Sequence, residues 1–307
     1  MSEDSGDVDG DQQRHDMTRW GHRQAAPRVK WHMLRRRKSD AAFLRENLTA
    51  ALRCGAACEV DIVFTADGHA LCLHDRTLDR ETTGRGRVAD TTRATIEYFR
   101  QRGPDGAVLD SAPLFLDEVA ATVTAIGVAA PALVQLDVKT RANGLTSTAL
   151  DRIADVLRDN ADAFIASAYE SESVRRFVAA VPGLHAGFDP LALYPRSFEL
   201  DAAGFRDVAT RMFAAAPDAS IYYLEAKLIL AALERGVDLV AEVTSAGAQV
   251  DAWTIDADHP DLNDVLRRLI DAGCHQITSN DPERLIRVIA RSRLTKVDQA
   301  SSADGNT

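Results

Sequence analysis

The chain has 307 residues, a formal net charge of −10 and a hydrophobic share of 46%. This length accommodates one large barrel domain or two small ones, and the hydrophobic share is ordinary for a globular protein with a sizeable core. The acidic balance argues against a general nucleic-acid binder, which needs a basic patch. A phosphate substrate stays compatible with this charge, because a divalent cation and a few basic side chains can supply positive charge locally.

The two ends of the chain differ in composition from its interior. Residues 1–26 are polar and charged and lack an apolar run, which predicts a disordered acidic tail and argues against a secretory signal. Residues 292–307 are also polar and predict a second disordered tail. The interior lacks the run of about 18 apolar residues that a membrane span needs, and four cysteines do not resemble a disulfide framework. We therefore expect a cytoplasmic protein.

Between these tails, residues 27–291 alternate short apolar runs with amphipathic segments. The runs predict eight strands, at Arg28–His32, Ala57–Val63, Leu133–Asp137, Ala163–Ser167, His185–Asp189, Ser220–Leu224, Val250–Ile255 and His275–Thr278. The amphipathic segments predict helices at Ala41–Arg53, Leu114–Ile126, Ser147–Leu157, Ser171–Ala180, Ala202–Ala215, Glu225–Ala246 (with a break at Gly236), Asp261–Ala272 and Pro282–Ala290. Eight successive βα units predict one α/β domain, a TIM-type (β/α)8 barrel.

One long segment after the second predicted strand departs from this alternation. Residues 66–113 begin with a turn at Ala66-Asp67-Gly68, continue as an extended run that ends at His74, and include the glycine-rich stretch Thr82–Gly86. Long ordered segments of this kind on a barrel are usually functional loops or small subdomains. The sequence thus predicts a small insertion after the second strand.

The first candidate for chemistry is a pair of acids in the second predicted strand. Glu59 and Asp61 stand two residues apart, so their side chains point to the same face. Two carboxylates on one inward face repel each other unless a cation lies between them, and Mg²⁺, Mn²⁺ and Ca²⁺ prefer oxygen ligands. The apolar neighbours Cys58, Val60 and Ile62 leave a second interpretation open, in which the acids face solvent.

The other candidates end neighbouring strands, where barrel enzymes place catalytic groups. Asp137 and Lys139 share one face of the third predicted strand; the acid would complete a metal triad, and the lysine would bind phosphate or keep the carboxylates ionised. A plain salt bridge is the alternative for this pair. His74 and His32 also lie at this rim, where an imidazole suits proton transfer; a structural role is the alternative for His32.

Several motifs, in their order and spacing, resemble the glycerophosphodiester phosphodiesterase family. The N-terminal motifs are Glu46-Asn47, Gly55-Ala56, Glu59-Val60-Asp61, Thr65-Ala66-Asp67-Gly68, His74-Asp75, Leu78-Asp79-Arg80 and Thr82-Thr83-Gly84-Arg85-Gly86. In the C-terminal half, Ala252–Asp256 is similar to the family's tryptophan–threonine strand, and the run through Ile277–Pro282 is similar to its last strand and turn. The resemblance covers residues 28–291.

This resemblance implies a TIM barrel with a small insertion after the second strand. It also implies metal-dependent hydrolysis of a small-molecule glycerophosphodiester to an alcohol and glycerol 3-phosphate, with Mg²⁺, Ca²⁺ or Mn²⁺ as the cofactor. The roles that it implies are metal ligation by Glu59, Asp61 and Asp137, acid–base work by His32 and His74, and phosphate binding by Lys139.

Two positions depart from the family pattern. The family has His-Arg-Gly after the first strand, whereas this chain has His32-Met33-Leu34, so an arginine further along would contact the substrate. The candidates are Arg35, Arg36 and Arg37. The dipeptide His22-Arg23 is a rival to His32, but His32 is preferred because Val29-Lys30-Trp31 supplies the strand before it. The third strand carries Asp137 where the family usually has Glu.

Two further residues are expected to line the substrate site. Glu225 follows the sixth predicted strand and would contact substrate hydroxyls, although an acid at a helix N-terminus has a structural explanation as well. Trp253 would stack on the substrate or fill the top of the barrel. The altered first-strand motif keeps two other functions open: a phospholipase D-like enzyme for another lipid or sugar phosphodiester, and a catalytically inactive barrel that serves as a binding protein.

Overall fold

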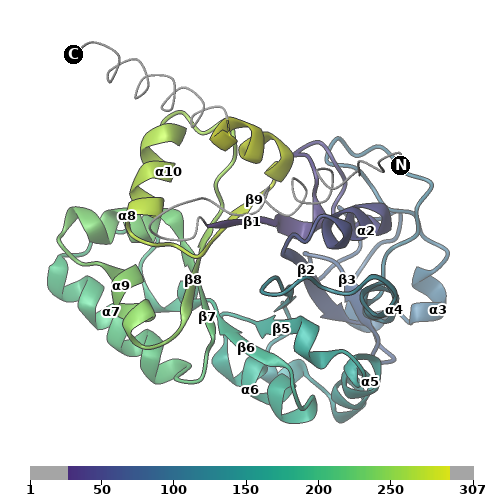
Figure 1. Cartoon of the computed structure of the whole chain (residues 1–307). Helices are drawn as coiled ribbons and strands as arrows, with labels where there is room; N and C mark the ends of the chain where they lie inside the picture. The colour runs from purple at the N-terminus through teal and green to yellow at the C-terminus, as the bar shows by residue number, and fades with distance from the viewer. Residues whose placement is uncertain (1–26, 291–307) are drawn as a thin grey trace, which may run out of the picture.

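The computed structural model of the chain describes residues 27–290, and both predicted tails lie outside the described residues. Nine strands form one sheet, in which β3 runs antiparallel to β2 and the other eight are parallel. Because β1 pairs with both β2 and β9, the parallel strands close into a barrel (Figure 1). The strands are β1 (Arg28–Trp31), β2 (Cys58–Phe64), β3 (Ala70–Cys72), β4 (Val134–Val138), β5 (Phe164–Ser167), β6 (His185–Phe188), β7 (Ile221–Glu225), β8 (Gln249–Trp253) and β9 (Gln276–Ser279).

Helices surround this ring of strands, which confirms the predicted (β/α)8 barrel (Figure 1). They are α2 (Arg45–Arg53), α3 (Arg93–Ile96), α4 (Leu116–Ile126), α5 (Ser147–Leu157), α6 (Ser171–Ala180), α7 (Ala202–Ala215), α8 (Ala226–Glu234), α9 (Leu239–Ser245), α10 (Leu262–Asp271) and residues 282–290. The predicted start of the first helix at Ala41 was wrong, because Phe43 has a φ of 58° that a right-handed helix excludes. The predicted break at Gly236 in the segment 225–246 is confirmed, since Gly236 has a φ of 72° and separates α8 from α9.

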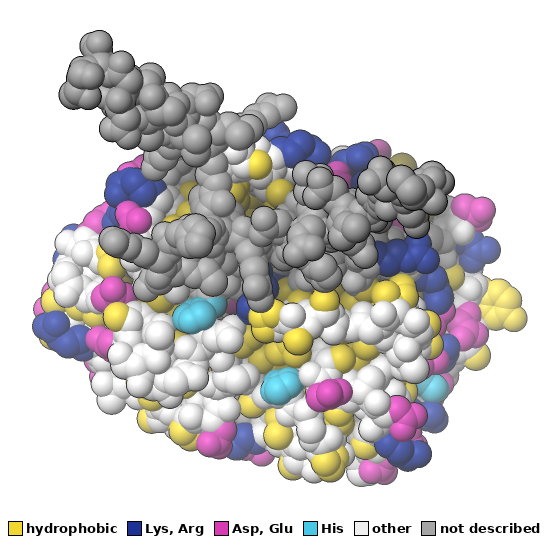
Figure 2. All heavy atoms as spheres, viewed as in Figure 1, with side chains coloured by type: hydrophobic (Ala, Val, Ile, Leu, Met, Phe, Trp, Pro, Cys, Tyr) yellow, Lys and Arg dark blue, Asp and Glu magenta, His cyan; other side chains and the backbone are white. Residues whose placement is uncertain are grey.

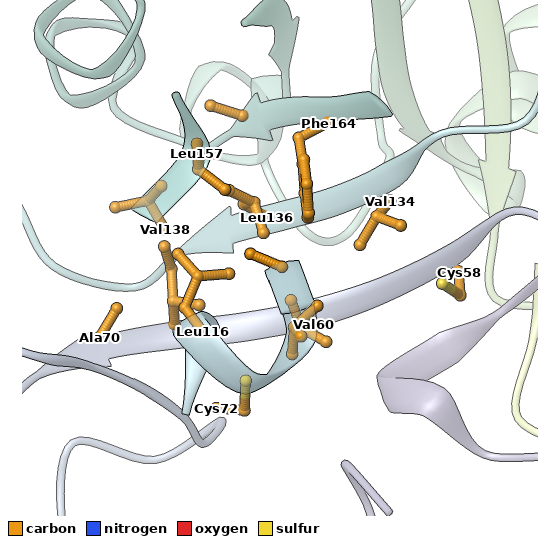
Figure 3. Packing of buried hydrophobic residues seen from close by; sticks show 14 of the residues in the cluster. Cys58, Val60, Ala70, Cys72, Leu116, Val134, Leu136, Val138, Leu157 and Phe164 are labelled. Atoms are coloured by element: carbon orange, nitrogen blue, oxygen red, sulfur yellow. The ribbon is translucent and has the colours of Figure 1, made fainter. Parts of the chain in front are cut away.

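Along each strand, successive side chains point alternately towards the surrounding helices and into the barrel. Val60 of β2 and Leu136 of β4 are paired in register, and both are fully buried against the helical layer that includes Leu116 and Leu157 (Figure 3). The alternate residues therefore point into the barrel. Glu59 is 5% exposed and Asp61 is 0% exposed, so the interpretation in which these acids face solvent was wrong.

Polar side chains also occupy the barrel interior beneath these acids. The Lys30 ammonium lies 2.9 Å from Asp251 Oδ2 and donates a hydrogen bond to Gln135. Asp251 accepts further hydrogen bonds from Gln276 and from the Thr278 hydroxyl, the latter at 2.6 Å. Lys30 is 2% exposed and Asp251 is 0% exposed. A buried ion pair that keeps its partners is tolerated, whereas a buried charge that loses its partner is strongly unfavourable.

We expect Lys30→Met to destabilise the fold by about 3 kcal/mol, because it leaves the Asp251 carboxylate buried without a cation. The midpoint of thermal unfolding should fall by roughly 6 °C or more. The matched control is Arg158→Met, which removes an ion pair with Asp155 whose side chains are both 70% exposed. Such a surface pair contributes about 0–1 kcal/mol. Calorimetry measures both unfolding midpoints. Equal decreases in the two variants would show that the interior ion pair stabilises the fold no more than the surface pair does.

The segment between β2 and α4, which we call the excursion (residues 65–115), packs around a small core of its own. β3 extends the sheet as an antiparallel strand on β2. Leu71, Leu78, Ile96 and Phe115 are buried together in this core. The excursion is therefore held against the barrel as an ordered unit, and it delivers His74 to the barrel's rim directly after β3.

Candidate functional site

Three carboxylates, two from β2 and one from the carboxyl end of β4, meet inside the barrel. Asp61 and Asp137 are paired in register, and Glu59 lies on the same face as Asp61. Each of the three offers an oxygen atom, and these atoms lie within 4.8 Å of one another. Glu59 Oε2 and Asp61 Oδ2 are buried and accept no hydrogen bond from a described residue. Because such oxygens are unfavourable unless something positive compensates them, this donor set fits a hard divalent cation.

Lys139 partly compensates this negative charge. Its ammonium lies 2.8 Å from Asp61 Oδ1 and forms an ion pair with Asp137. Burial alone would lower the pKa of Lys139, but Asp137 and Asp61 raise that pKa above its usual value, so the amine stays charged. Burial would likewise raise the pKa of Asp137, but Lys139 outweighs it and lowers that pKa. For Glu59, burial raises the pKa and the neighbouring His32 only partly opposes the shift.

His32 follows β1 at the mouth of the barrel. Its Nε2 atom lies 3.5 Å from Glu59 Oε2, and its Nδ1 atom lies 2.7 Å from Asn280 Oδ1. The two residues after it, Met33 and Leu34, have φ angles of 53° and 54°. This left-handed backbone disfavours residues with a side chain by about 1–2 kcal/mol each. Leu34 is 0% exposed, so burial of its side chain offsets part of this strain.

Asn280 determines how the His32 ring is oriented, a role that the sequence did not indicate although Asn280 lies in a recognised motif. Asp256 holds the Asn280 amide: the backbone N–H donates to Oδ1 at 2.9 Å and the side-chain amide donates to Oδ2 at 3.2 Å. The Asn280 side-chain oxygen is therefore free to accept from His32 Nδ1. This tautomer leaves His32 Nε2, the nitrogen that faces Glu59, without a proton in the neutral ring.

A second oriented imidazole, that of His74, comes from the excursion. Its Nδ1 atom lies 2.9 Å from Asp75 Oδ1, and its backbone N–H donates to Glu81 Oε2 at 3.2 Å. Arg80 grips the Asp75 carboxylate with two hydrogen bonds of 2.6 and 2.7 Å. These hydrogen bonds lower the pKa of Asp75 to about 2, so it remains an acceptor for His74. The His74 side chain is 45% exposed, which leaves Nε2 accessible to a substrate.

His74, Asp75 and Glu81 also lie close enough together to suggest a metal site. Arg80 already binds both carboxylates, Asp75 at 2.6 Å and Glu81 through a second ion pair. A guanidinium in this place supplies the positive charge that a cation would otherwise bring. The cluster of Glu59, Asp61 and Asp137 is therefore the better candidate.

Ser167, at the end of β5, is a further residue that the sequence did not indicate. Its hydroxyl donates to Asp137 Oδ1 at 3.1 Å and accepts from Gln135 Nε2 at 2.8 Å. These two hydrogen bonds fix the Asp137 carboxylate from the side opposite Lys139. In the sequence, only the position of Ser167 at the end of a predicted strand suggested a role at the site. Serine is common at such positions, so this alone did not identify it.

The opposite half of the rim carries other polar groups. Glu225 ends β7, accepts a hydrogen bond from Tyr194 Oη at 3.0 Å and pairs with Arg196 at 3.0 Å. Trp253 ends β8 with its indole N–H buried and without an acceptor. Asp189 follows β6, and burial raises its pKa to about 8. These groups could meet substrate hydroxyls across the barrel from the carboxylate cluster.

The three arginines proposed to replace the family's missing one have different partners. Arg35 is partly buried, and its Nη1 atom lies 3.4 Å from the same Asn280 oxygen that His32 contacts. Arg36 and Arg37 instead bind Glu283 at the protein surface. The structure thus brings Arg35 to the site and does not bring Arg36 there. His22, the rival to His32, lies outside the described residues.

The surface charge of the described residues is mixed. Figure 2 shows lysine and arginine side chains beside aspartate and glutamate around the edge of the visible face. Among residues 27–290, no helix has both the length and the apolar character needed to cross a bilayer.

Solved structures with a similar fold come from several bacteria. One is a glycerophosphoryl diester phosphodiesterase from Parabacteroides distasonis, with a TM-score of 0.61 and 16% identity over 91% of each chain. Another is a phosphodiesterase from Oleispira antarctica in complex with the product sn-glycerol-3-phosphate; its TM-score is 0.61, with 17% identity over 86% of this chain and 97% of that one. At such identities the likeness shows a shared fold.

Sequence relatives match shorter stretches. "Probable glycerophosphodiester phosphodiesterase 1" from Mycobacterium tuberculosis is 37% identical over 97 residues, which make up 28% of this chain and 35% of that protein. The human glycerophosphodiester phosphodiesterase 1 is 42% identical over 64 residues, covering 19% of this chain and 18% of that protein. The chain thus spans about a third or less of the length of these relatives.

The family comparison covers far more of the molecule. The model of the glycerophosphoryl diester phosphodiesterase family matches residues 46–284, from the start of α2 into the final helix. Of the candidate site residues described above, His32 and Arg35 lie before the matched range. The match contains all three carboxylates, His74, Lys139 and Asn280. This chain therefore belongs to the glycerophosphoryl diester phosphodiesterase family.

Proposed function

We propose that this chain hydrolyses a glycerophosphodiester to an alcohol and glycerol 3-phosphate, and that the reaction depends on a divalent metal ion. The observation that carries the proposal is the cluster of three buried carboxylates, in which Glu59 Oε2 and Asp61 Oδ2 have no hydrogen-bond or ion-pair partner closer than the oriented His32 imidazole, 3.5 Å from Glu59. The family match and the product seen in the Oleispira antarctica relative support it. The same support favours catalysis over a barrel that only binds, and a glycerophosphodiester over another lipid or sugar phosphodiester.

The metal would be held by Glu59, Asp61 and Asp137, whose hard oxygen donors suit Mg²⁺, Mn²⁺ or Ca²⁺. When bound, such an ion supplies Lewis-acid stabilisation of the charge that develops on the phosphoryl oxygens. Asp137 reaches less far than the usual Glu, and Ser167 and Lys139 hold it in place. Lys139 would also bind a phosphate oxygen, because its ammonium stays charged at the cluster.

The two histidines would divide the proton transfers. In this assignment, His32 Nε2 takes the proton from the attacking hydroxyl, which belongs to water or to a neighbouring substrate hydroxyl. His74 Nε2 gives its proton to the oxygen of the leaving alcohol as the phosphorus–oxygen bond to that alcohol breaks. Asn280 accepts from His32 Nδ1, which leaves His32 Nε2 free to take a proton. Asp75 accepts from His74 Nδ1, and its negative charge stabilises the doubly protonated ring from which His74 Nε2 would donate.

Contacts to the rest of the substrate would come from Arg35, Glu225 and Trp253. Arg36 is left out of this set because its guanidinium binds Glu283. We retain the prediction of one catalytic domain over residues 27–291 and of a location in the cytoplasm. Its substrate would be a small molecule and not a nucleic acid.

Removal of divalent metal is expected to abolish release of glycerol 3-phosphate from glycerophosphoglycerol or glycerophosphocholine. An enzyme-coupled assay for glycerol 3-phosphate, run in excess chelator and then with added Mg²⁺, Mn²⁺ or Ca²⁺, measures this. Activity should return with at least one of the three ions. Full activity in excess chelator would contradict metal dependence. Turnover of a lipid or sugar phosphodiester without turnover of either glycerophosphodiester would favour the phospholipase D-like alternative.

A further inference from the structure

A cavity lies between the barrel mouth and the excursion. Its volume is about 190 Å³, and its lining includes Arg35, Phe43, Leu73, Glu81 and Arg102. Arg35 and Phe43 come from the loop after β1, whereas the other three come from the excursion. The cavity thus exists only because two segments far apart in the sequence pack together.

This cavity adjoins the groups proposed for catalysis. Leu73 lines it, and the Leu73 backbone N–H donates to the backbone oxygen of Asp61 at 3.1 Å. His74 is the next residue, and its backbone N–H donates to the Glu81 carboxylate that forms part of the cavity wall. The cavity is thus one residue away from Asp61 and His74 along these contacts, on the side of the cluster where part of a bound substrate would lie.

Two guanidiniums in the wall have no carboxylate partner among residues 27–290. Arg35 Nε is buried without an acceptor, and the hydrogen bond that Arg35 makes goes to the neutral amide of Asn280. Arg102 donates to the backbone oxygens of Thr82 at 2.8 Å and Gly106 at 3.0 Å. The third arginine of the wall, Arg80, is neutralised by Asp75 and Glu81. In a chain with a net charge of −10, this is a locally positive pocket.

The chemistry of the wall defines what would fit. Guanidinium groups without carboxylate partners favour carboxylate or phosphate groups, to which they bind through two parallel hydrogen bonds. Phe43 and Leu73 supply apolar surface for a short carbon skeleton. Glu225 and Asp189, at the ends of β7 and β6, would be the partners for hydroxyls of the glycerol portion. The cavity therefore suits the leaving alcohol better than the glycerol portion.

We propose that this cavity binds the leaving alcohol of the substrate and that this alcohol carries a second anionic group, recognised by Arg35 and Arg102. The inference rests on the proposed function and adds the substrate class to it. A charge-assisted hydrogen bond contributes about 1.5–3 kcal/mol, which corresponds to a preference of about tenfold or more for the charged alcohol.

Two substrates of nearly equal size test this preference. One is glycerophosphoglycerol, whose leaving alcohol is neutral; the other is its glycerate analogue, in which a carboxylate replaces the terminal CH₂OH. For the unaltered protein we expect kcat/KM to be about tenfold higher for the glycerate diester. A third substrate with a phosphorylated leaving glycerol tells whether the pocket prefers phosphate or carboxylate. A ratio at or below one for both charged alcohols overturns the inference.

Variants locate the preference in the cavity. Arg102→Gln should reduce the ratio of charged to neutral substrate by about fivefold or more, and Arg102→Lys, which keeps the charge, should restore part of it. The matched control is Arg100→Gln, which removes an arginine two positions away that does not line the cavity. If Arg100→Gln reduced the ratio of charged to neutral substrate equally, the effect would come from the protein's overall charge. That result would overturn the role of Arg102.

The outcomes also separate this inference from the proposed function. Turnover of all three substrates without a preference overturns the anionic pocket and leaves the proposed hydrolysis intact. Turnover of none, with each divalent metal present, overturns the proposed hydrolysis and with it the assignment of this cavity to a leaving alcohol.

Discussion

Asp61→Asn is expected to lower kcat/KM for a glycerophosphodiester by at least about a thousandfold, which corresponds to about 4 kcal/mol of transition-state stabilisation. The substitution keeps the shape of the side chain but removes the charge of the proposed metal ligand that is most deeply buried. The contact that the Asp61 carboxylate makes with a described residue is its ion pair with Lys139, and Lys139 retains Asp137 as a partner in the variant. The fold should therefore tolerate the change, and reduced repulsion among the carboxylates should offset the lost contact with Lys139.

Unfolding temperatures measured with and without metal test whether Asp61 is a metal ligand. A metal that binds the native state raises the unfolding temperature of the unaltered protein as its concentration increases. Asp61→Asn should abolish or strongly weaken this shift while keeping an unfolding temperature close to that of the unaltered protein without metal. Asp155→Asn, at a side chain that is 70% exposed on α5, is the matched control and should keep the full shift. A normal metal-dependent shift in Asp61→Asn would contradict the proposed ligand set.

His74→Ala should lower kcat by about 10²–10⁴-fold, the range expected for loss of a general acid. The side chain is 45% exposed, so its removal takes away a proton donor without opening a cavity in the core. A diester with a nitrophenol leaving group needs little protonation on departure. With that substrate the loss should be much smaller, which distinguishes proton donation from substrate binding.

His69→Ala provides the control for the His74 variant. His69 also belongs to the excursion and lies 3.9 Å from Asp67, away from the groups that contact His74. It should turn over both substrates at normal rates. Two results would contradict the acid role: an unchanged rate in His74→Ala, or an equal loss with alcohol and nitrophenol leaving groups.

Much of the barrel could be read from the order of residues, because each strand is specified by a short local pattern. Cys58–Phe64 and Val134–Val138 alternate apolar and polar side chains, and the predicted strands there match the observed ones within two residues. The shared face of Glu59 and Asp61 also followed from local geometry. The limits of α2 did not, since the backbone at Phe43 is held in a left-handed conformation by contacts outside the local pattern, including a hydrogen bond to Met33.

The sequence could not predict which residues far apart in the chain contact each other at the site. Ser167 supports Asp137 from a different strand, and Asn280 reaches His32 across 248 positions of the chain. Arg35 and Arg36 are neighbours, yet one lies beside the site and the other binds Glu283 on the surface. Nothing in a run of arginines says which of them turns inward, because that depends on where the last turn of the barrel brings Asn280 and Glu283.

By itself the sequence determined the succession of strands and helices, the family to which the chain belongs, and the residue types able to bind a metal ion and to move protons. These follow from local periodicity and from the spacing of side chains along single strands. Closure of the barrel decided the rest. The inward face of the acids, the tautomers of the two histidines and the positive cavity beside His74 all depend on contacts between segments distant in the chain, and only packing in three dimensions brings such segments together.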